Sequence, residues 1–173
     1  MKMKEICLLS QSEKRAKWGE GPWVYESDQI TWQDNETNLY CFAIRNSEMG
    51  TWCGYVAIDN TYSIYENKYD DIDVLIHGGL TYAGNIDELF SAFAEDENLK
   101  NLSVFGFDCG HAGDFIPFFK SNILNGVYRN AMFIKQECAS LAKQFQKFRC
   151  KKTQAIKTKN RISKFTRFEN LEM

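Results

Sequence analysis

The sequence predicts a single α+β domain, in which one long C-terminal helix packs across a mainly antiparallel sheet. Three observations lead to this class. The chain has 173 residues, which suits one domain with a sizeable core. Apolar runs of strand length recur from residue 23 to residue 108, separated by short polar turns. Residues 130–148 instead carry apolar side chains every three or four positions, the period of a helix with one buried face.

The strand pattern is clearest where two apolar runs are joined by a short connection. Residues 46–50 end in glycine and link the runs 39–45 and 51–58, so an antiparallel hairpin is expected. The run 102–108 is the most hydrophobic and should be a central strand. Residues 85–93 have the texture of a short helix, whereas residues 1–22 specify no element. The remaining predicted strands cover residues 23–25, 29–32 and 72–76.

Composition excludes several classes of protein. No apolar run approaches the roughly 18 residues of a membrane span, so no membrane association is expected. The apolar stretch near the first residue is too short for a secretory signal, which predicts a cytoplasmic protein. Six cysteines occur without any C-x-x-C pair, so neither a disulfide framework nor a four-cysteine zinc site is expected.

The charge is distributed unevenly along the chain. Residues 138–168 contain ten Lys or Arg and no acidic residue, whereas residues 1–137 contain eleven basic and twenty-one acidic residues. We therefore divide the chain into an α+β domain, residues 1–150, and a basic C-terminal extension, residues 151–173. Residues 138–168 can bind nucleic acid. The preferred interpretation is a solvated helix face and tail.

The only two histidines occupy matching positions. His77 opens the motif HGGLT and His111 lies within GFDCGHAGD, and each follows an apolar run that reads as a strand. Side chains just past such strands lie at the edge of a sheet, where functional residues are often placed. The two imidazoles should therefore share one rim, with Asp108 or Asp114 hydrogen-bonded to a ring.

This set of side chains is suited to acid and base chemistry on a phosphate ester, because imidazole titrates near neutral pH and a carboxylate can fix its tautomer. Cleavage of a phosphodiester or pyrophosphate is the preferred reaction, although the sequence does not separate cleavage from capture of the ligand. The predicted catalytic residues are His77, His111, Asp108 and Asp114. The predicted ligand-binding residues are Gly78, Gly79, Thr81, Tyr82, Gly110, Tyr128 and Arg129.

Other interpretations of the same residues remain open. No cofactor is predicted, but His77, Asp108, His111 and Asp114 together offer nitrogen and oxygen ligands for Mn²⁺, Fe²⁺ or Zn²⁺. Cys109 can act as a nucleophile with His111 as its base. Trp52, Tyr82 and Tyr128 can stack on a captured nucleotide. Finally, the four histidine and aspartate side chains can form a purely structural hydrogen-bonded network.

The two motifs, together with Gly54-Tyr-Val, Tyr128-Arg129 and the helical Glu137-x-x-x-Leu-Ala, resemble a family of small accessory proteins encoded mainly by bacteriophages and prophages. The resemblance covers about residues 52–145. It implies a protein that acts against host defence in the bacterial cytosol, including defence systems that signal through modified or cyclic nucleotides. A small nucleotide-like ligand is the implied partner. The alternative is a non-catalytic inhibitor that binds a host defence protein or nucleic acid, and a second copy of the chain is another candidate partner.

Overall fold

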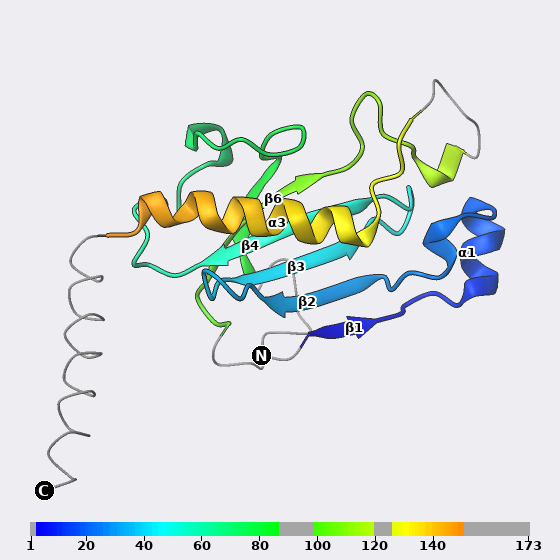
Figure 1. Cartoon of the computed structure of the whole chain (residues 1–173), viewed down its shortest axis with the longest axis horizontal. Helices are drawn as coiled ribbons and strands as arrows, with labels where there is room; N and C mark the ends of the chain where they lie inside the picture. Colours follow the sequence, from blue (N-terminus) through cyan, green and yellow to red (C-terminus); the bar gives the residue numbers. More distant parts are fainter. Residues whose placement is uncertain (1–2, 87–98, 120–125, 151–173) are drawn as a thin grey trace, which may run out of the picture.

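A six-stranded sheet organises the part of the chain that the computed structural model describes, residues 3–86, 99–119 and 126–150. Its strand order is β1-β2-β3-β4-β6-β5, and all neighbours are antiparallel. α3 lies across one face (Figure 1), which confirms the predicted fold class. The strands are β1 (Lys4–Ile6), β2 (Gln29–Gln33), β3 (Tyr40–Arg45), β4 (Trp52–Ile58), β5 (Tyr82–Asn85) and β6 (Ser103–Asp108). The helices are α1 (Gln11–Trp18) and α3 (Ala131–Phe145), with 3₁₀ turns η1 (Pro22–Val24), η2 (Tyr69–Asp71), η4 (Pro117–Phe119) and η5 (Gln146–Phe148).

The predicted hairpin is confirmed as β3 and β4. Its turn is held by the Asn46 side chain, which accepts hydrogen bonds from two amides of the turn, and by Gly50 at a φ of +77°. In the ladder, Ala43 pairs with Gly54. A Cβ at Gly54 would meet the Cys138 sulfur at 3.0 Å, so this glycine lets α3 approach the sheet closely.

The helix predicted over residues 130–148 is also confirmed, as α3 followed by η5. It begins where the Asn130 side chain accepts a hydrogen bond from the Phe133 amide, a standard N-cap. The apolar residues of its inner face are fully buried against the sheet, and each contributes roughly 1.5–3 kcal/mol by leaving water. These residues are Ile134, Cys138, Leu141 and Phe145.

The other face of the sheet carries a second, smaller core. There Phe42, Ala57 and Val104 pack with Ile86 and Leu99. β6, predicted as a central strand, has neighbours on both sides, β4 and β5, but lies next to the edge of the sheet. Both faces of the sheet are buried, so successive side chains of β6 pack in different cores. The residues that follow β6 lie beyond the end of the sheet.

The strand predicted over residues 72–76 is wrong. The segment has the alternation of a strand, since Ile72, Val74 and Ile76 pack on the core while Leu75 is 87% exposed. It nevertheless pairs with none of the strands in the described residues, because its backbone lies along α3. The Gln144 side chain bonds both the amide and the carbonyl of Leu75, each at 2.8 Å. An alternating apolar pattern therefore indicates an extended segment with one buried side, but it does not by itself show that the segment pairs with a neighbouring strand.

The N-terminal third contains a second correction. Residues 23–25 were predicted as a strand, but Trp23 and Val24 belong to η1, which has Pro22 at its first position, and Tyr25 is its C-cap. Residues 1–22, which specified no element, supply β1 and α1, and Ser10 with Glu13 forms a reciprocal capping box at the start of α1. Most of the helix predicted over residues 85–93, and the basic extension 151–173, lie outside the described residues; Asn85 itself ends β5.

A buried charge network joins the N-terminal third to the start of α3. The Arg45 side chain is 1% exposed and donates to Glu26 Oε2 at 2.9 Å, to Asp28 Oδ1 at 3.2 Å and to the Tyr128 hydroxyl at 2.8 Å. Asp28 also pairs with the buried ammonium group of Lys14 at 2.8 Å. Because every charge has an opposite partner, the network can remain ionised inside the protein.

Glu26 carries this network to the helix. Its Oε1 accepts the amide of Ala131, the first residue of α3, and its Oε2 accepts the indole N–H of Trp52 at 3.1 Å. Burial opposes the charge, but hydrogen bonds from Tyr128, the Ala131 amide, Arg45 and Trp52 outweigh it, so the pKa of Glu26 lies below its usual value. The segment between Tyr128 and Ala131 is thereby fixed, and it contains Arg129.

Candidate site at the histidine pair

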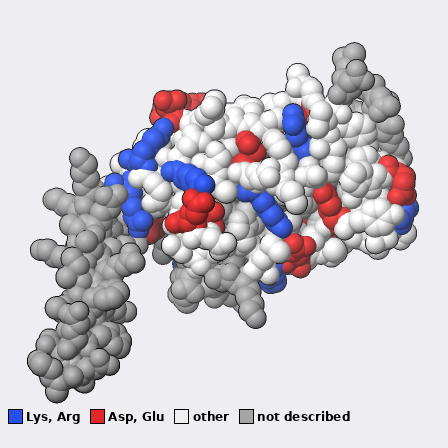
Figure 2. All heavy atoms as spheres, in the orientation of Figure 1, with Lys and Arg blue, Asp and Glu red and all other residues white. Residues whose placement is uncertain are grey.

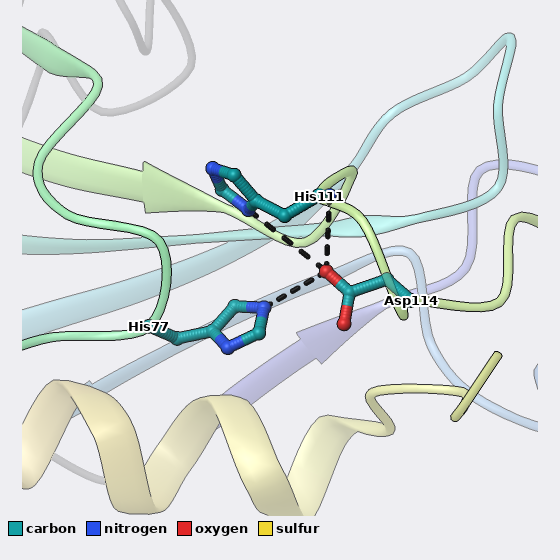
Figure 3. A group of neighbouring side chains, drawn as sticks. All are labelled: His77, His111 and Asp114. Carbon is teal, nitrogen blue, oxygen red and sulfur yellow. Dashed lines mark hydrogen bonds and ion pairs between the residues drawn. The ribbon is translucent and has the colours of Figure 1, made fainter.

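The two histidines come together from separate loops. His77 follows the segment that runs along α3, and His111 follows β6. Their ring centroids are 5.4 Å apart and the rings are nearly perpendicular, at 88°. Figure 3 shows both rings turned toward the Asp114 carboxylate, so the predicted proximity of the histidines is confirmed.

Asp114 is the centre of the cluster, and its side chain is only 1% exposed. Its Oδ2 forms a hydrogen bond of 2.8 Å with His77 Nε2 and accepts the His111 amide at 3.1 Å. Its Oδ1 accepts from Arg129 Nε at 2.8 Å. An ionised carboxylate can only accept, so His77 Nε2 carries the proton of that bond. The expected hydrogen bond between an aspartate and an imidazole is confirmed for Asp114.

The chain brings Arg129 to Asp114 through an isolated bridge. Asp114 pairs with Val127, and hydrogen bonds link Phe115 to Val127 and Val127 to Gly113. The Arg129 guanidinium then lies 4.8 Å from the centre of the Phe133 ring, with its side chain 28% exposed. A guanidinium has five N–H donors, so Nε can hold Asp114 while the others face a ligand.

The pKa of Asp114 lies below its usual value. Burial of the carboxyl acts in the opposite direction, but it is outweighed by hydrogen bonds from Arg129, from His77 and from the His111 amide. Asp114 is therefore ionised at neutral pH, and it supplies the one negative charge that the surrounding donors share.

His111 is held by its fit against Gly78. Gly78 has a φ of +67°, and a Cβ there would overlap the His111 ring, so only glycine allows this approach. The Nδ1 atom of His111 is buried and has no hydrogen-bond partner; it lies 3.8 Å from Asp108 Oδ1 and 3.9 Å from Asp114 Oδ2. A buried polar atom without a partner typically costs about 1–3 kcal/mol.

Helix α3 positions the other histidine. The His77 amide donates to Glu137 Oε2 at 3.0 Å. The rings of His77 and Phe133 are nearly perpendicular, with centroids 5.3 Å apart. Phe133 and Glu137 were not among the predicted site residues. They lie one turn apart on α3, and Glu137 belongs to the Glu137-x-x-x-Leu-Ala pattern of the resemblance. The signal was present, but its link to His77 depends on the loop path along the helix.

Asp108 lies at the margin of the cluster. Its neighbours Phe107 and Cys109 belong to the core under α3, so Asp108 faces the opposite side of the sheet. Its Oδ1 accepts the Gly110 amide at 2.9 Å and its side chain is 39% exposed. Tyr82 also lies on that side, where it packs edge-on against Tyr55. Neither side chain takes part in the Asp114 contacts.

The alternative in which Cys109 acts as a nucleophile is excluded by its burial. Cys109 is 1% exposed, and burial raises the pKa of its thiol well above the usual value, so a thiolate is disfavoured. Stacking by Trp52 is also wrong, because this residue is completely buried and its indole bonds Glu26. Tyr128 directs its hydroxyl to Glu26 and Arg45 and packs against Trp23, which places it in the support of the site.

The glycines of the two loops leave open space beside the histidines, but the amides of Gly79 and Gly110 are not free to bind a ligand. The Gly79 amide is bonded to the Ile76 carbonyl, the Gly110 amide to Asp108 and the Thr81 amide to the Gly106 carbonyl, so these three amides already have acceptors. No heavy atom lies within 4 Å of a Cβ built at Gly79 or at Gly113. The loops are therefore open beside the histidines.

A metal ion has one plausible set of ligands in the described part of the chain. The ligand atoms of His77, His111 and Asp114 lie within 4.8 Å of one another. Asp108, the fourth residue of the predicted set, is not part of this group. The structure thus reduces the predicted four ligands to three.

A separate hollow of about 520 Å³ lies at the other end of β5 and β6. It is lined by the tyrosine-rich segment around Tyr65 and Tyr69 and by the strand residues Gly84 and Ser103. None of the predicted site residues lines it. The histidine cluster and this hollow are therefore distinct features of the surface.

We expect Asp114→Asn to lower stability in a pH-dependent way. Ionised Asp114 stabilises the fold above its ordinary pKa of about 3.9, and this contribution is lost as the pH falls through its lower folded-state pKa. The variant should be less stable by about 2–3 kcal/mol at neutral pH, because bonds to a charged acceptor are lost. Urea unfolding from neutral pH to below about pH 3.9 measures the difference, which should narrow as the pH falls. Asp108→Asn, at a more exposed carboxylate, is the control. If the difference in unfolding free energy between the wild type and Asp114→Asn does not change with pH, ionised Asp114 does not stabilise the fold in this way.

Within the described residues, no helix has both the length and the apolar composition needed to span a bilayer. No family model matches the chain, and neither a curated protein nor a solved structure matches it significantly. The resemblance to phage accessory proteins stays a prediction. The functional assignment below is argued from the geometry of the cluster.

Proposed function

We propose that this is a phage-type accessory protein that acts in the host cytosol against a nucleotide-based defence signal, by degrading or capturing a small phosphate-bearing nucleotide. One observation carries the proposal. Two imidazoles converge, 5.4 Å apart, on a single buried carboxylate that also holds an arginine. Imidazoles can act as general acid and base, and an arginine can bind phosphate oxygens. The cluster therefore suits binding and cleavage of a phosphate ester.

Hydrolysis places clear demands on the site. The oxygen of a water molecule bonds to phosphorus and the phosphorus–oxygen bond to the leaving group breaks, while the water loses a proton and the leaving oxygen gains one. Imidazoles assist by accepting and donating these protons, or by holding a metal ion that makes the water more acidic. Arg129 is placed to bind the phosphate oxygens, because guanidinium groups match their geometry.

The charge distribution favours a small ligand over a long nucleic acid. Residues 1–137 carry ten more acidic than basic groups, which repel a polyanion. Figure 2 shows basic and acidic side chains interspersed on the face that α3 covers. Two of the basic residues of α3 and η5 have partners within the domain, since Lys143 pairs with Glu36 at 3.0 Å and Lys147 donates to the Asp73 carbonyl.

A second function is favoured by exposed apolar residues next to the cluster. Leu75 lies two residues before His77 and is 87% exposed, while Met132 precedes Phe133 and is 68% exposed. Val127, the bridge partner of Asp114, is 55% exposed. A contiguous patch of exposed apolar side chains would mark a protein interface. The alternative is a non-catalytic inhibitor that binds a host defence protein through residues beside the cluster.

The test is incubation of the purified full chain with cyclic dinucleotides, short oligonucleotides and ADP-ribose derivatives, followed by denaturation and chromatography. New products identify an enzyme. An intact nucleotide that is released only on denaturation identifies a capturing protein. If no nucleotide is altered or retained, the proposal is wrong and the protein-directed inhibitor takes its place.

A further inference from the structure

We propose that His77, His111 and Asp114 bind one divalent first-row transition-metal ion, and that this ion is part of the working site. The inference deepens the proposed function, because the same three side chains carry both. It narrows the predicted set of four ligands to three and changes the role of the imidazoles from proton carriers to metal ligands.

The distances suit an ion with little rearrangement. Metal–nitrogen and metal–oxygen bonds are about 2.0–2.2 Å long, so neighbouring ligand atoms at right angles lie roughly 3 Å apart. His77 Nε2 and Asp114 Oδ2 are 2.8 Å apart, and His111 Nδ1 is 3.9 Å from that oxygen. A small rotation of the His111 ring closes the second gap, and the ion then replaces the proton between His77 and Asp114.

The unpartnered nitrogen of His111 is the independent observation. Its Nδ1 atom is buried from water yet accepts and donates no hydrogen bond. Gly78 allows the ring to lie beside the cluster, because any side chain there would displace it. A nitrogen that is shielded from water is poorly suited to take a proton from a substrate water. It is well suited to coordinate an ion enclosed between the two rings.

Surrounding groups orient the ligands as they do in known metal sites. Arg129 binds Oδ1 of Asp114, the oxygen that does not bond His77, and Glu137 accepts the backbone amide of His77. Such outer partners set the direction of the ligand atoms. Three protein ligands leave coordination positions for a water molecule and a phosphate oxygen, which is the arrangement of catalytic sites.

The donor atoms indicate the class of metal. Two imidazole nitrogens and one carboxylate oxygen favour Fe²⁺, Mn²⁺ or Zn²⁺, and this combination on one face of an ion is familiar from non-haem iron sites. Ca²⁺ and Mg²⁺ prefer oxygen ligands and fit less well. The bound ion would supply Lewis acidity to the phosphate and to the attacking water.

The experiment uses the full chain stripped of metal with a chelator and then titrated with Zn²⁺ and with Mn²⁺ in a calorimeter. We expect one ion per chain, with affinity reduced about 100-fold or more in His77→Ala and in His111→Ala, because even outer partners contribute about 10–100-fold. Asp73→Asn, which changes an exposed carboxylate four residues before His77, is the matched control and should bind as the wild type does. Visible absorption of bound Co²⁺ in the unmodified chain reports nitrogen ligation without any variant.

The outcomes separate this inference from the proposed function. An ion that binds through the histidines in a protein that alters no nucleotide supports the metal site and removes the hydrolase. Nucleotide cleavage at full rate in excess chelator supports the hydrolase and overturns the metal site. Failure of the stripped wild type to bind any of the three ions, or binding that survives both histidine variants, also overturns it.

Discussion

His77→Ala is expected to lower the turnover of the cleaved nucleotide by about 10²–10⁴-fold. The reason is that the ring faces the carboxylate at the centre of the cluster, through a bond of 2.8 Å to Asp114. Loss of the ring removes a proton carrier or a metal ligand that assists the breaking of the phosphorus–oxygen bond. Steady-state kinetics with the nucleotide found in the panel measures the effect.

His111→Ala should have an effect of similar size, because the two rings serve one step. Ser63→Ala is the control: its side chain is exposed, and its backbone amide, which bonds Phe148, is unchanged by the substitution. A capturing protein would behave differently, since loss of one neutral hydrogen bond weakens binding by only about 0.5–1.5 kcal/mol. Turnover that persists in both histidine variants would show that the cluster is structural.

Arg45→Ala should have the largest effect on stability, lowering the free energy of unfolding by about 3–5 kcal/mol. The guanidinium is buried and holds two carboxylates, a hydroxyl and two carbonyls. Truncation leaves Glu26 without its cation and Asp28 with Lys14 alone. It also loosens the segment that carries Arg129 to Asp114, so ligand binding should weaken as well.

Urea unfolding with Arg15→Ala as the control measures this effect. Arg15 also pairs with a carboxylate, Glu20, but both side chains are largely in water, at 40% and 62% exposure. Such surface pairs contribute about 0–1 kcal/mol. If the Arg45 and Arg15 variants lose similar stability, the buried network does not support the domain in the way described.

Much of the fold follows from local patterns. The β3–β4 hairpin and α3 were predictable because one has turn chemistry between two apolar runs and the other a helical period. The buried charges of Lys14 and Arg45 were not, since charged residues are normally exposed and only tertiary contacts reveal their partners. The same limit explains Trp52, whose ring is enclosed by elements distant in sequence.

The proximity of the two histidines was predicted from the expectation that each follows a strand, and this expectation holds for only one of them. His111 follows a strand as expected, but His77 follows a segment bonded to α3 side chains. The histidines still meet, because that segment ends beside the residues that follow β6. The sequence could not distinguish Asp114 from Asp108. That choice depends on the β6 residues, whose alternation turns Asp108 to the other face, and on the bridge that brings Arg129 to Asp114.

The most direct test of the account uses the fact that the chain has only two histidines. A long-range ¹H–¹⁵N spectrum therefore contains signals from two imidazole rings, which can be followed as each nucleotide of the panel is added. The account predicts that at least one nucleotide shifts the signals of both rings together, at one affinity, and that Asp73→Asn, at an exposed carboxylate outside the cluster, leaves this response unchanged. Rings that respond to no nucleotide, or only one ring that responds, would contradict a single nucleotide site at His77 and His111.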